Sequence, residues 1–297
     1  MTIIGRREFV RLTAGAASVS GMAAAKEPDI RFPAAPRDRI AVASYPFRES
    51  IENPRKPGSG LTRMPLTQFP AMVVERYKIR NVELLGEQFP STEPAYLREL
   101  RAATDKAGVK IVNLPVSPRA ASYIEDGHKW IDAAVALECP SIRVHIPRAG
   151  GHAPDFDQTV AHLQAIASYG EEKNVVVNLE NDDPKSEEAG FIVKLIEKVG
   201  SPYLHALPDF CNSMLIGPEQ YDYDSVRAMF AHAYNICHVK DSEVDGRKVY
   251  RVDVDRTFAI AKAAGYRGYF SMEWEGEGDA YDGTAKLIAM SLKNLAA

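Results

Sequence analysis

The chain has 297 residues, of which 45% are hydrophobic and 26% are charged. Such a chain can bury a complete core, which excludes a disordered protein and allows one large α/β domain or two ordinary domains. The formal net charge is −4, and no long run of Lys or Arg provides a basic surface, so we expect no nucleic-acid partner.

The N-terminal stretch is typical of an export signal. Arg6 and Arg7 precede a weakly apolar, Ala/Gly-rich stretch that ends in a run of small residues, 23–25. This order predicts a twin-arginine signal over residues 1–25, cleaved near residue 25. The stretch is too short and too weakly apolar for a good membrane span. We therefore expect a mature protein in the bacterial periplasm, with no membrane contact after cleavage.

From about residue 38 onward, short β-branched runs alternate with longer amphipathic runs. Eight strands are predicted, at 39–47, 81–86, 110–116, 141–147, 175–181, 204–210, 234–241 and 269–276. Helical patterns between them, several ending in Gly or Asn, include 93–108, 128–138, 156–174 and 187–200. Eight βα units without a linker predict a single (β/α)8 TIM barrel over residues 38–297. A doubly wound open sheet is the alternative, but its glycine fingerprint is absent after the first strand.

Four consecutive strands end in residue types that bind metals: Glu180, Asp209, His238 and Glu273. Each residue alone has an ordinary structural explanation, such as a helix cap or an ion pair. Together they would converge at the C-terminal mouth of a barrel, where three carboxylates repel one another unless a cation lies between them. One nitrogen and three oxygen ligands predict one divalent metal ion and suit Mn²⁺, Zn²⁺, Mg²⁺ or Co²⁺ without choosing among them.

Further polar residues are expected at the same mouth. His145 ends a predicted strand and is interpreted as a substrate contact or a proton-transfer group. Lys240, two residues after His238, is expected to stabilise an enolate or to neutralise the carboxylates. Arg148 is interpreted either as a substrate-binding residue or as a solvated side chain, and Glu83 either as a substrate-binding residue or as a polar group deep in the barrel.

The order of four short motifs resembles the xylose isomerase-like TIM barrels of the sugar phosphate isomerase/epimerase superfamily. The motifs are NLEN (178–181), PDF (208–210), HVKD (238–241) and SMEWEG (271–276). The resemblance covers nearly all of the predicted barrel. It implies that the four strand-end residues bind the ion, and that Glu180 and Glu273 also move protons.

The chain departs from this family at one position. Many members have a substrate- or metal-contacting His three residues after the Asp, where this chain has Asn212, which we interpret as a substrate-binding residue. The endonuclease branch of the family uses several additional histidines, and this chain has seven in total. A DNA-repair activity is therefore disfavoured.

The predicted chemistry begins with removal of a proton next to a carbonyl. A divalent ion chelated by a polyol polarises the carbonyl, so that one carboxylate can remove the neighbouring proton and another can return it. These steps predict a sugar or keto-sugar isomerase or epimerase that works through an enediolate. The alternatives are a lyase or dehydratase acting on a keto-sugar or keto-glycoside, and a non-catalytic carbohydrate-binding barrel. The expected partner is a small, unphosphorylated carbohydrate, and the question of a homo-oligomer stays open.

Overall fold

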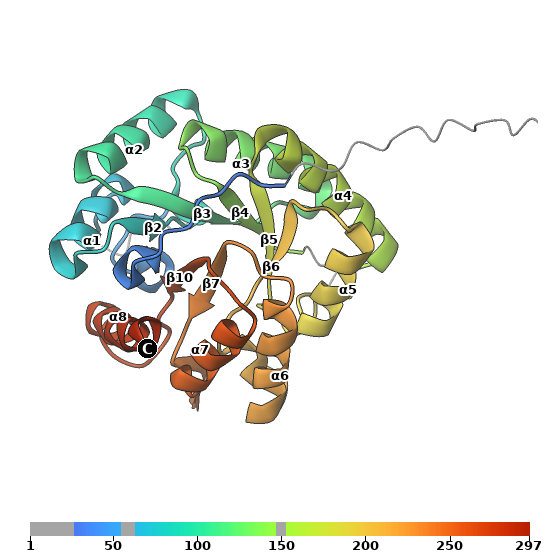
Figure 1. Cartoon of the computed structure of the whole chain (residues 1–297). Coiled ribbons are helices and arrows are strands. Elements are labelled where there is room, and N and C mark those ends of the chain that lie inside the picture. Colours follow the sequence, from blue (N-terminus) through green and yellow to red (C-terminus); the bar gives the residue numbers. More distant parts are fainter. Residues whose placement is uncertain (1–26, 55–62, 147–152) are drawn as a thin grey trace, which may run out of the picture.

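The computed structural model describes residues 27–54, 63–146 and 153–297. Its centre is an eight-stranded parallel sheet with the order β6-β5-β4-β3-β2-β1-β10-β7 (Figure 1). The strands are β1 (Ile40–Ala43), β2 (Asn81–Glu83), β3 (Lys110–Val116), β4 (Ser141–Val144), β5 (Val176–Glu180), β6 (Leu204–Leu207), β7 (Ile236–Val239) and β10 (Tyr269–Met272). Each lies within one of the eight runs that the sequence predicts as strands.

The sheet curves into a nearly closed barrel. Its two end strands, β6 and β7, meet through two isolated parallel bridges, Ala206 with Ala233 and Asp209 with His238. The helices surround the strands on the outside (Figure 1). This arrangement confirms the predicted TIM barrel and brings two of the predicted metal ligands side by side.

Eight α-helices occur in the described ranges, and side-chain and glycine caps mark several of their ends. The helices α2, α4 and α5 end at Gly108, Asn174 and Gly200, whose positive φ angles of 64°, 57° and 63° stop a helix. The helices are α1 (Phe69–Tyr77), α2 (Pro94–Ala107), α3 (Tyr123–Ala136), α4 (Phe156–Lys173), α5 (Ala189–Val199), α6 (Glu219–Phe230), α7 (Val254–Ala263) and α8 (Ala280–Ala296). The glycine and asparagine stops read from the sequence are therefore confirmed at these three helices.

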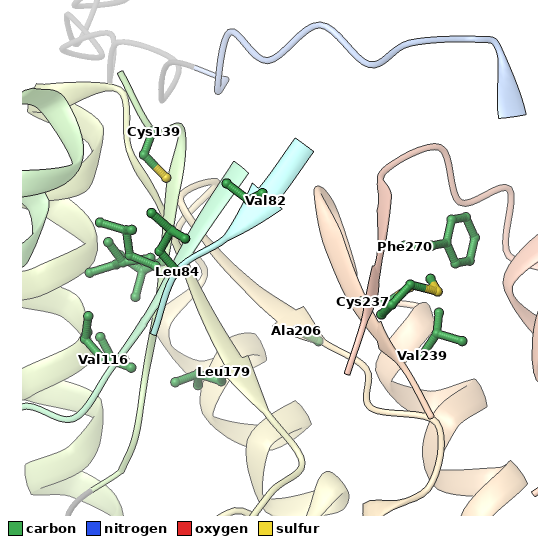
Figure 2. Close-up of a cluster of buried hydrophobic side chains, with 14 of the residues drawn as sticks. Val82, Leu84, Val116, Cys139, Leu179, Ala206, Cys237, Val239 and Phe270 are labelled. Atoms are coloured by element: carbon green, nitrogen blue, oxygen red, sulfur yellow. The ribbon is translucent and has the colours of Figure 1, made fainter. Parts of the chain in front are cut away.

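The apolar core lies mainly between the strands and the surrounding helices. Figure 2 shows part of it, with Val82 and Leu84 at one part of the strand wall and Cys237, Val239 and Phe270 at another. The three cysteines of the chain, Cys139, Cys211 and Cys237, are buried and unpaired. None of the helices in the described ranges combines the length and the apolar character that a membrane crossing requires.

The N-terminal end of the barrel is closed by the chain segment that precedes β1. Phe32 packs edge-on against Tyr234 and Tyr269, with ring centroids 5.4 and 6.2 Å away. The hydroxyl of Tyr234 donates to the backbone carbonyl of Pro28 at 3.0 Å. This end of the barrel interior is therefore covered, and the polar strand ends lie at the opposite mouth.

An antiparallel hairpin that the sequence analysis did not predict follows β7. Its strands are β8 (Ser242–Asp245) and β9 (Lys248–Arg251), with Val244 opposite Val249. Gly246 in the turn has a φ of 61°, which suits glycine in a tight hairpin. The local signal was present, since Asp-Gly between alternating residues favours such a turn.

Candidate metal centre and active site

The C-terminal ends of four neighbouring β-strand units bring together the four predicted metal ligands. Glu180 ends β5, Asp209 follows β6, His238 lies in β7 and Glu273 follows β10. Each offers one ligand atom, and these atoms all lie within 4.8 Å of one another. All four side chains are buried, so their charges interact in a medium that screens them weakly.

Asp209 lies in the loop after β6, where hydrogen bonds fix its backbone and one of its carboxylate oxygens. Its backbone N–H donates to Asn181 Oδ1 at 2.7 Å, and its Oδ1 accepts from the N–H groups of Cys211 and Asn212 at 2.9 and 2.8 Å. Its second oxygen, Oδ2, is buried without a hydrogen bond from the described residues. Such an oxygen beside two glutamates and an imidazole fits a divalent metal ion.

His238 lies between three carboxylates, and its two ring nitrogens face different ones. Nδ1 lies 2.6 Å from Glu180 Oε1 and 3.0 Å from Glu273 Oε2, while Nε2 lies 2.8 Å from Glu83 Oε1. Burial alone lowers the pKa of His238, but the charges of Glu180, Glu273 and Glu83 raise it well above its ordinary value. The imidazole must give up its proton on the ligand side when it binds a metal.

Glu83 lies behind His238 and does not line the cavity described below. Its side chain is fully buried, and Oε1 also accepts from Asn113 Nδ2 at 3.1 Å. The substrate-binding interpretation of Glu83 stays a prediction, since Glu83 is not among the residues that line this cavity. The other interpretation, a polar group deep in the barrel, describes its position.

Two buried cations lie beside the carboxylates. Arg143 Nε, from β4, lies 3.0 Å from Glu180 Oε2. Lys240 Nζ lies 3.5 Å from Glu273 Oε2 and 3.7 Å from Asp209 Oδ2. The sequence analysis named Lys240 but missed Arg143. The only sign of Arg143 in the sequence was its position as a basic residue within an apolar predicted strand.

Lys240 is fixed by further partners around its ammonium group. It donates to Asn212 Oδ1 at 2.9 Å and to Glu243 Oε2 at 3.1 Å, and it also contacts Glu275. Burial lowers the pKa of Lys240, but the charges of Asp209 and the surrounding glutamates raise it well above its ordinary value. Lys240 therefore remains a cation at the mouth of the barrel.

His145 lies at the same mouth in a different setting. Its Nδ1 lies 3.1 Å from the buried carboxylate of Glu187, which also accepts from the backbone N–H of Ile146 at 2.8 Å. Its Nε2 contacts Arg143 and lies 3.6 Å from Asp182 Oδ2. His145, Asp182 and Glu187 also offer ligand atoms within 4.8 Å of one another, and the Arg143 guanidinium contacts the imidazole of this second group.

A cavity of about 170 Å³ connects these groups. It is lined by Tyr45, Leu85, Glu87, Ser117, Arg143, His145, Glu180, Asp182, Asn212, Lys240, Glu273 and Glu275. The sequence analysis placed Asn212, His145 and Lys240 at this mouth and missed most of the other lining residues. Arg148 lies outside the described residues.

Comparisons with known proteins agree with this architecture. A family model described as xylose isomerase-like TIM barrel matches residues 73–295. A xylose isomerase-like TIM barrel protein from Mycobacterium smegmatis, solved with magnesium, has a TM-score of 0.69 and 16% identity, covering 86% of this chain and 96% of its own. No curated protein matches the chain significantly in sequence.

Two further solved structures have a similar fold. D-allulose 3-epimerase from Methylomonas sp., in complex with D-allulose, has a TM-score of 0.65 and 15% identity, covering 88% of this chain and 98% of its own. The probable 3-DHS dehydratase AsbF from Bacillus anthracis has a TM-score of 0.63 and 16% identity, covering 85% and 98%. At these identities the similarity shows the fold alone.

Proposed function

Since this chain belongs to the xylose isomerase-like TIM barrel family, we propose that it is a metal-dependent isomerase or epimerase of a sugar or keto-sugar. One observation carries the proposal: three buried carboxylates and one imidazole offer ligand atoms within 4.8 Å of one another, beside a small polar cavity. Structures of similar fold include proteins named as epimerases, which agrees with this class of reaction.

Glu180, Asp209, His238 and Glu273 would hold one divalent ion. Bound there, such an ion would polarise a substrate carbonyl and make the neighbouring C–H more acidic. Magnesium in one protein of similar fold agrees with a divalent ion but does not identify it. Manganese, zinc and cobalt fit the same ligand set.

Glu180 and Glu273 both line the cavity and are the proposed groups that remove and return the proton. The ion pair with Arg143 holds Glu180 in one orientation. Burial raises the pKa of Glu180, but His238 and Arg143 lower it more, so this carboxylate is ionised. The Lys240 ammonium would stabilise negative charge that develops on a substrate oxygen.

A second candidate reaction is β-elimination from the same kind of substrate. It requires an acid that protonates the leaving oxygen after the C–H proton has been removed. His145 faces the cavity, and although burial and Arg143 lower its pKa, the carboxylates of Glu187 and Asp182 give a net increase. The raised pKa favours a protonated His145, which could act as this acid. A probable dehydratase is among the proteins of similar fold.

Metal content and hydrogen exchange test the proposal together. Wild-type protein, metal-loaded and dialysed, should retain about one divalent ion per chain by elemental mass spectrometry, whereas Asp209→Ala should retain none. In D₂O, the loaded protein should incorporate deuterium next to the carbonyl of at least one keto-sugar from a panel that includes D-allulose, D-fructose and L-ribulose. A wild-type protein that retains no ion would contradict the proposal, and so would exchange that proceeds equally after chelation.

A further inference from the structure

A second cavity, of about 480 Å³, lies beside the metal-site cavity at the C-terminal mouth. Its lining comes from the segment after β1, from the start of β8 and from the loop between β10 and α8. Glu275 lines both cavities. The proposed proton transfer uses only the smaller cavity, so the larger one needs a separate explanation.

Side chains at the junction connect the two cavities. One carboxylate oxygen of Glu275 contacts Lys240, and the other lies 3.7 Å from Arg48 Nη2. The Arg48 guanidinium lies 4.3 Å from the ring centroid of Tyr45, which lines the metal-site cavity. Glu243, which is 8% exposed, reaches the same Lys240 from the second cavity. A ligand in the second cavity would therefore lie next to the groups that surround the metal ligands.

The lining of the second cavity is acidic. Its five carboxylate side chains are Glu49, Glu243, Glu275, Glu277 and Asp279. Among the described residues that line it, Arg48 is the one cationic side chain, and Glu275 lies beside that guanidinium. Four of these carboxylates have partners: Glu49 pairs with Arg63, Glu243 and Glu275 pair with Lys240, and Asp279 caps α8. The carboxylates still outnumber these cations, which disfavours phosphate and carboxylate groups, whereas carboxylate oxygens accept hydrogen bonds from hydroxyl groups. The lining thus favours a neutral, hydroxyl-rich group.

The sizes of the two cavities point to a ligand with two parts. The metal-site cavity, at about 170 Å³, is smaller than the roughly 300–1,000 Å³ of ordinary ligand pockets. The neighbouring cavity adds about 480 Å³. One sugar unit at the metal site could therefore extend into this second space through a group attached to it.

We propose that the second cavity is a subsite for a second neutral sugar unit, joined to the unit that reacts. The substrate class is then a disaccharide that contains a keto-sugar, instead of a free monosaccharide or a sugar phosphate. This inference rests on the proposed function of the first cavity for the identity of the reacting unit.

Calorimetric titration of the metal-loaded chain compares D-fructose with the keto-disaccharides turanose, lactulose and isomaltulose. Because a hydrogen bond to a charged group is worth about a factor of ten or more, at least one disaccharide should bind roughly tenfold more tightly than D-fructose. Val244→Trp, which fills the second cavity from β8, should reduce disaccharide binding to the D-fructose level and leave D-fructose binding unchanged. Val135→Trp, the same substitution on the exposed face of α3, is the matched control and should change neither.

Several results would overturn the subsite. They are equal binding of D-fructose and every disaccharide, an equal effect of Val244→Trp on both classes, and tighter binding of fructose 6-phosphate. Tighter binding of a 4-nitrophenyl glycoside than of any disaccharide would assign the cavity to an aromatic group instead. Metal content and deuterium incorporation into monosaccharides are measured separately, so these results leave the proposed function of the first cavity standing.

Discussion

At the scale of single residues, two histidines of the barrel mouth have different surroundings. His238 is fully buried, with carboxylates at both ring nitrogens, whereas His145 is half-buried, with Glu187 at Nδ1 and with Arg143 and Asp182 near Nε2. The first arrangement suits a metal ligand whose orientation is fixed, and the second suits a group that exchanges protons with a ligand in the cavity. The two roles lead to different expectations for substitutions.

We predict that Glu180→Gln and Glu273→Gln separate proton transfer from metal binding. Glutamine keeps an oxygen donor in place but cannot accept a proton, so deuterium incorporation should fall about 10²–10⁴-fold. Metal occupancy should fall much less, in contrast to Asp209→Ala. His145→Ala should lower activity with the metal retained. If both glutamine variants keep near-native turnover, another base acts, and His145 is the next candidate.

We predict that Glu83 strengthens metal binding without touching the metal. Its Oε1 accepts the Nε2 proton of His238 at 2.8 Å, which leaves Nδ1 as the nitrogen that faces Glu180 and Glu273. Removing such a partner of a metal-binding histidine typically costs about 10–100-fold in metal affinity. Glu83→Leu should show this loss by competitive chelator titration, and Glu83→Gln, which retains an acceptor, should lose less.

Glu187→Gln is the matched control for that measurement. Glu187 is also a buried carboxylate that binds a histidine, but its partner is His145. The metal affinity of the Glu187→Gln protein should therefore stay near the wild-type value. The Glu83→Leu protein is first shown to be folded by its cooperative unfolding. If its metal affinity is then unchanged, Glu83 does not have the role assigned to it.

At the scale of elements, α6 places a buried carboxyl group behind the loop that follows β6. Asp222 is in the first turns of α6 and fully buried, facing the short helical turn Asn212–Leu215. Burial raises its pKa to about 7, and the nearby backbone N–H groups of Met214 and Ser213 offset only part of this effect. The element therefore contains an acid that is uncharged in the folded protein at mildly acidic pH.

We predict that Asp222 lowers the free energy of unfolding as pH rises from about 4 to 7. The unfolded chain loses this proton near its ordinary pKa of about 3.9, while the folded chain retains it to about pH 7. Asp222→Asn should thus match wild type near pH 4 and be more stable at pH 8, by an amount on the order of 3 kcal/mol. Urea unfolding of both proteins across this range measures the difference.

The exposed Asp224 on the same helix provides the control. Its pKa is lowered by hydrogen bonds from Gln220 and Arg227, so its charge does not change between pH 5 and 8. The stability difference for Asp224→Asn should be flat over that range. An equally flat difference for Asp222→Asn would show that burial does not shift this carboxyl group.

At the scale of the whole molecule, the first described residues follow the predicted export signal and contact the barrel. Tyr203 Oη donates to the carbonyl of Glu27 at 3.4 Å, and Asp29 N donates to Asn174 Oδ1 at 3.1 Å. Cleavage near residue 25 would leave these contacts intact. Residues 1–25 themselves lie outside the described ranges, so their export role stays a prediction.

We predict that a bacterial host with the twin-arginine pathway delivers the folded protein to the periplasm, cleaved near residue 25. Cell fractionation and N-terminal sequencing measure this directly. Replacing Arg6 and Arg7 together by Lys should keep the chain uncleaved in the cytoplasm, whereas Arg80→Lys on the folded body should not. Uncleaved wild-type protein in the cytoplasm would contradict the export argument and the preference for unphosphorylated substrates that follows from it.

Sequence patterns alone were sufficient to predict the eight barrel strands and the four residues at their ends. Strand period, glycine stops and βα alternation are local signals, and parallel strands of one barrel necessarily direct their carboxyl ends to one mouth. The hairpin after β7 also had a local signal, in Asp245-Gly246, which the strand count overlooked.

The tertiary structure decided which side chains inside the barrel meet. Glu83 and His238 are 155 positions apart, Arg143 pairs with Glu180 across neighbouring strands, and Glu275 lies between two cavities. These contacts depend on strand register, on barrel closure and on the paths of the connecting loops. Local patterns specify the position of a residue along its own strand, but the distance between side chains on different strands is set only when the sheet closes.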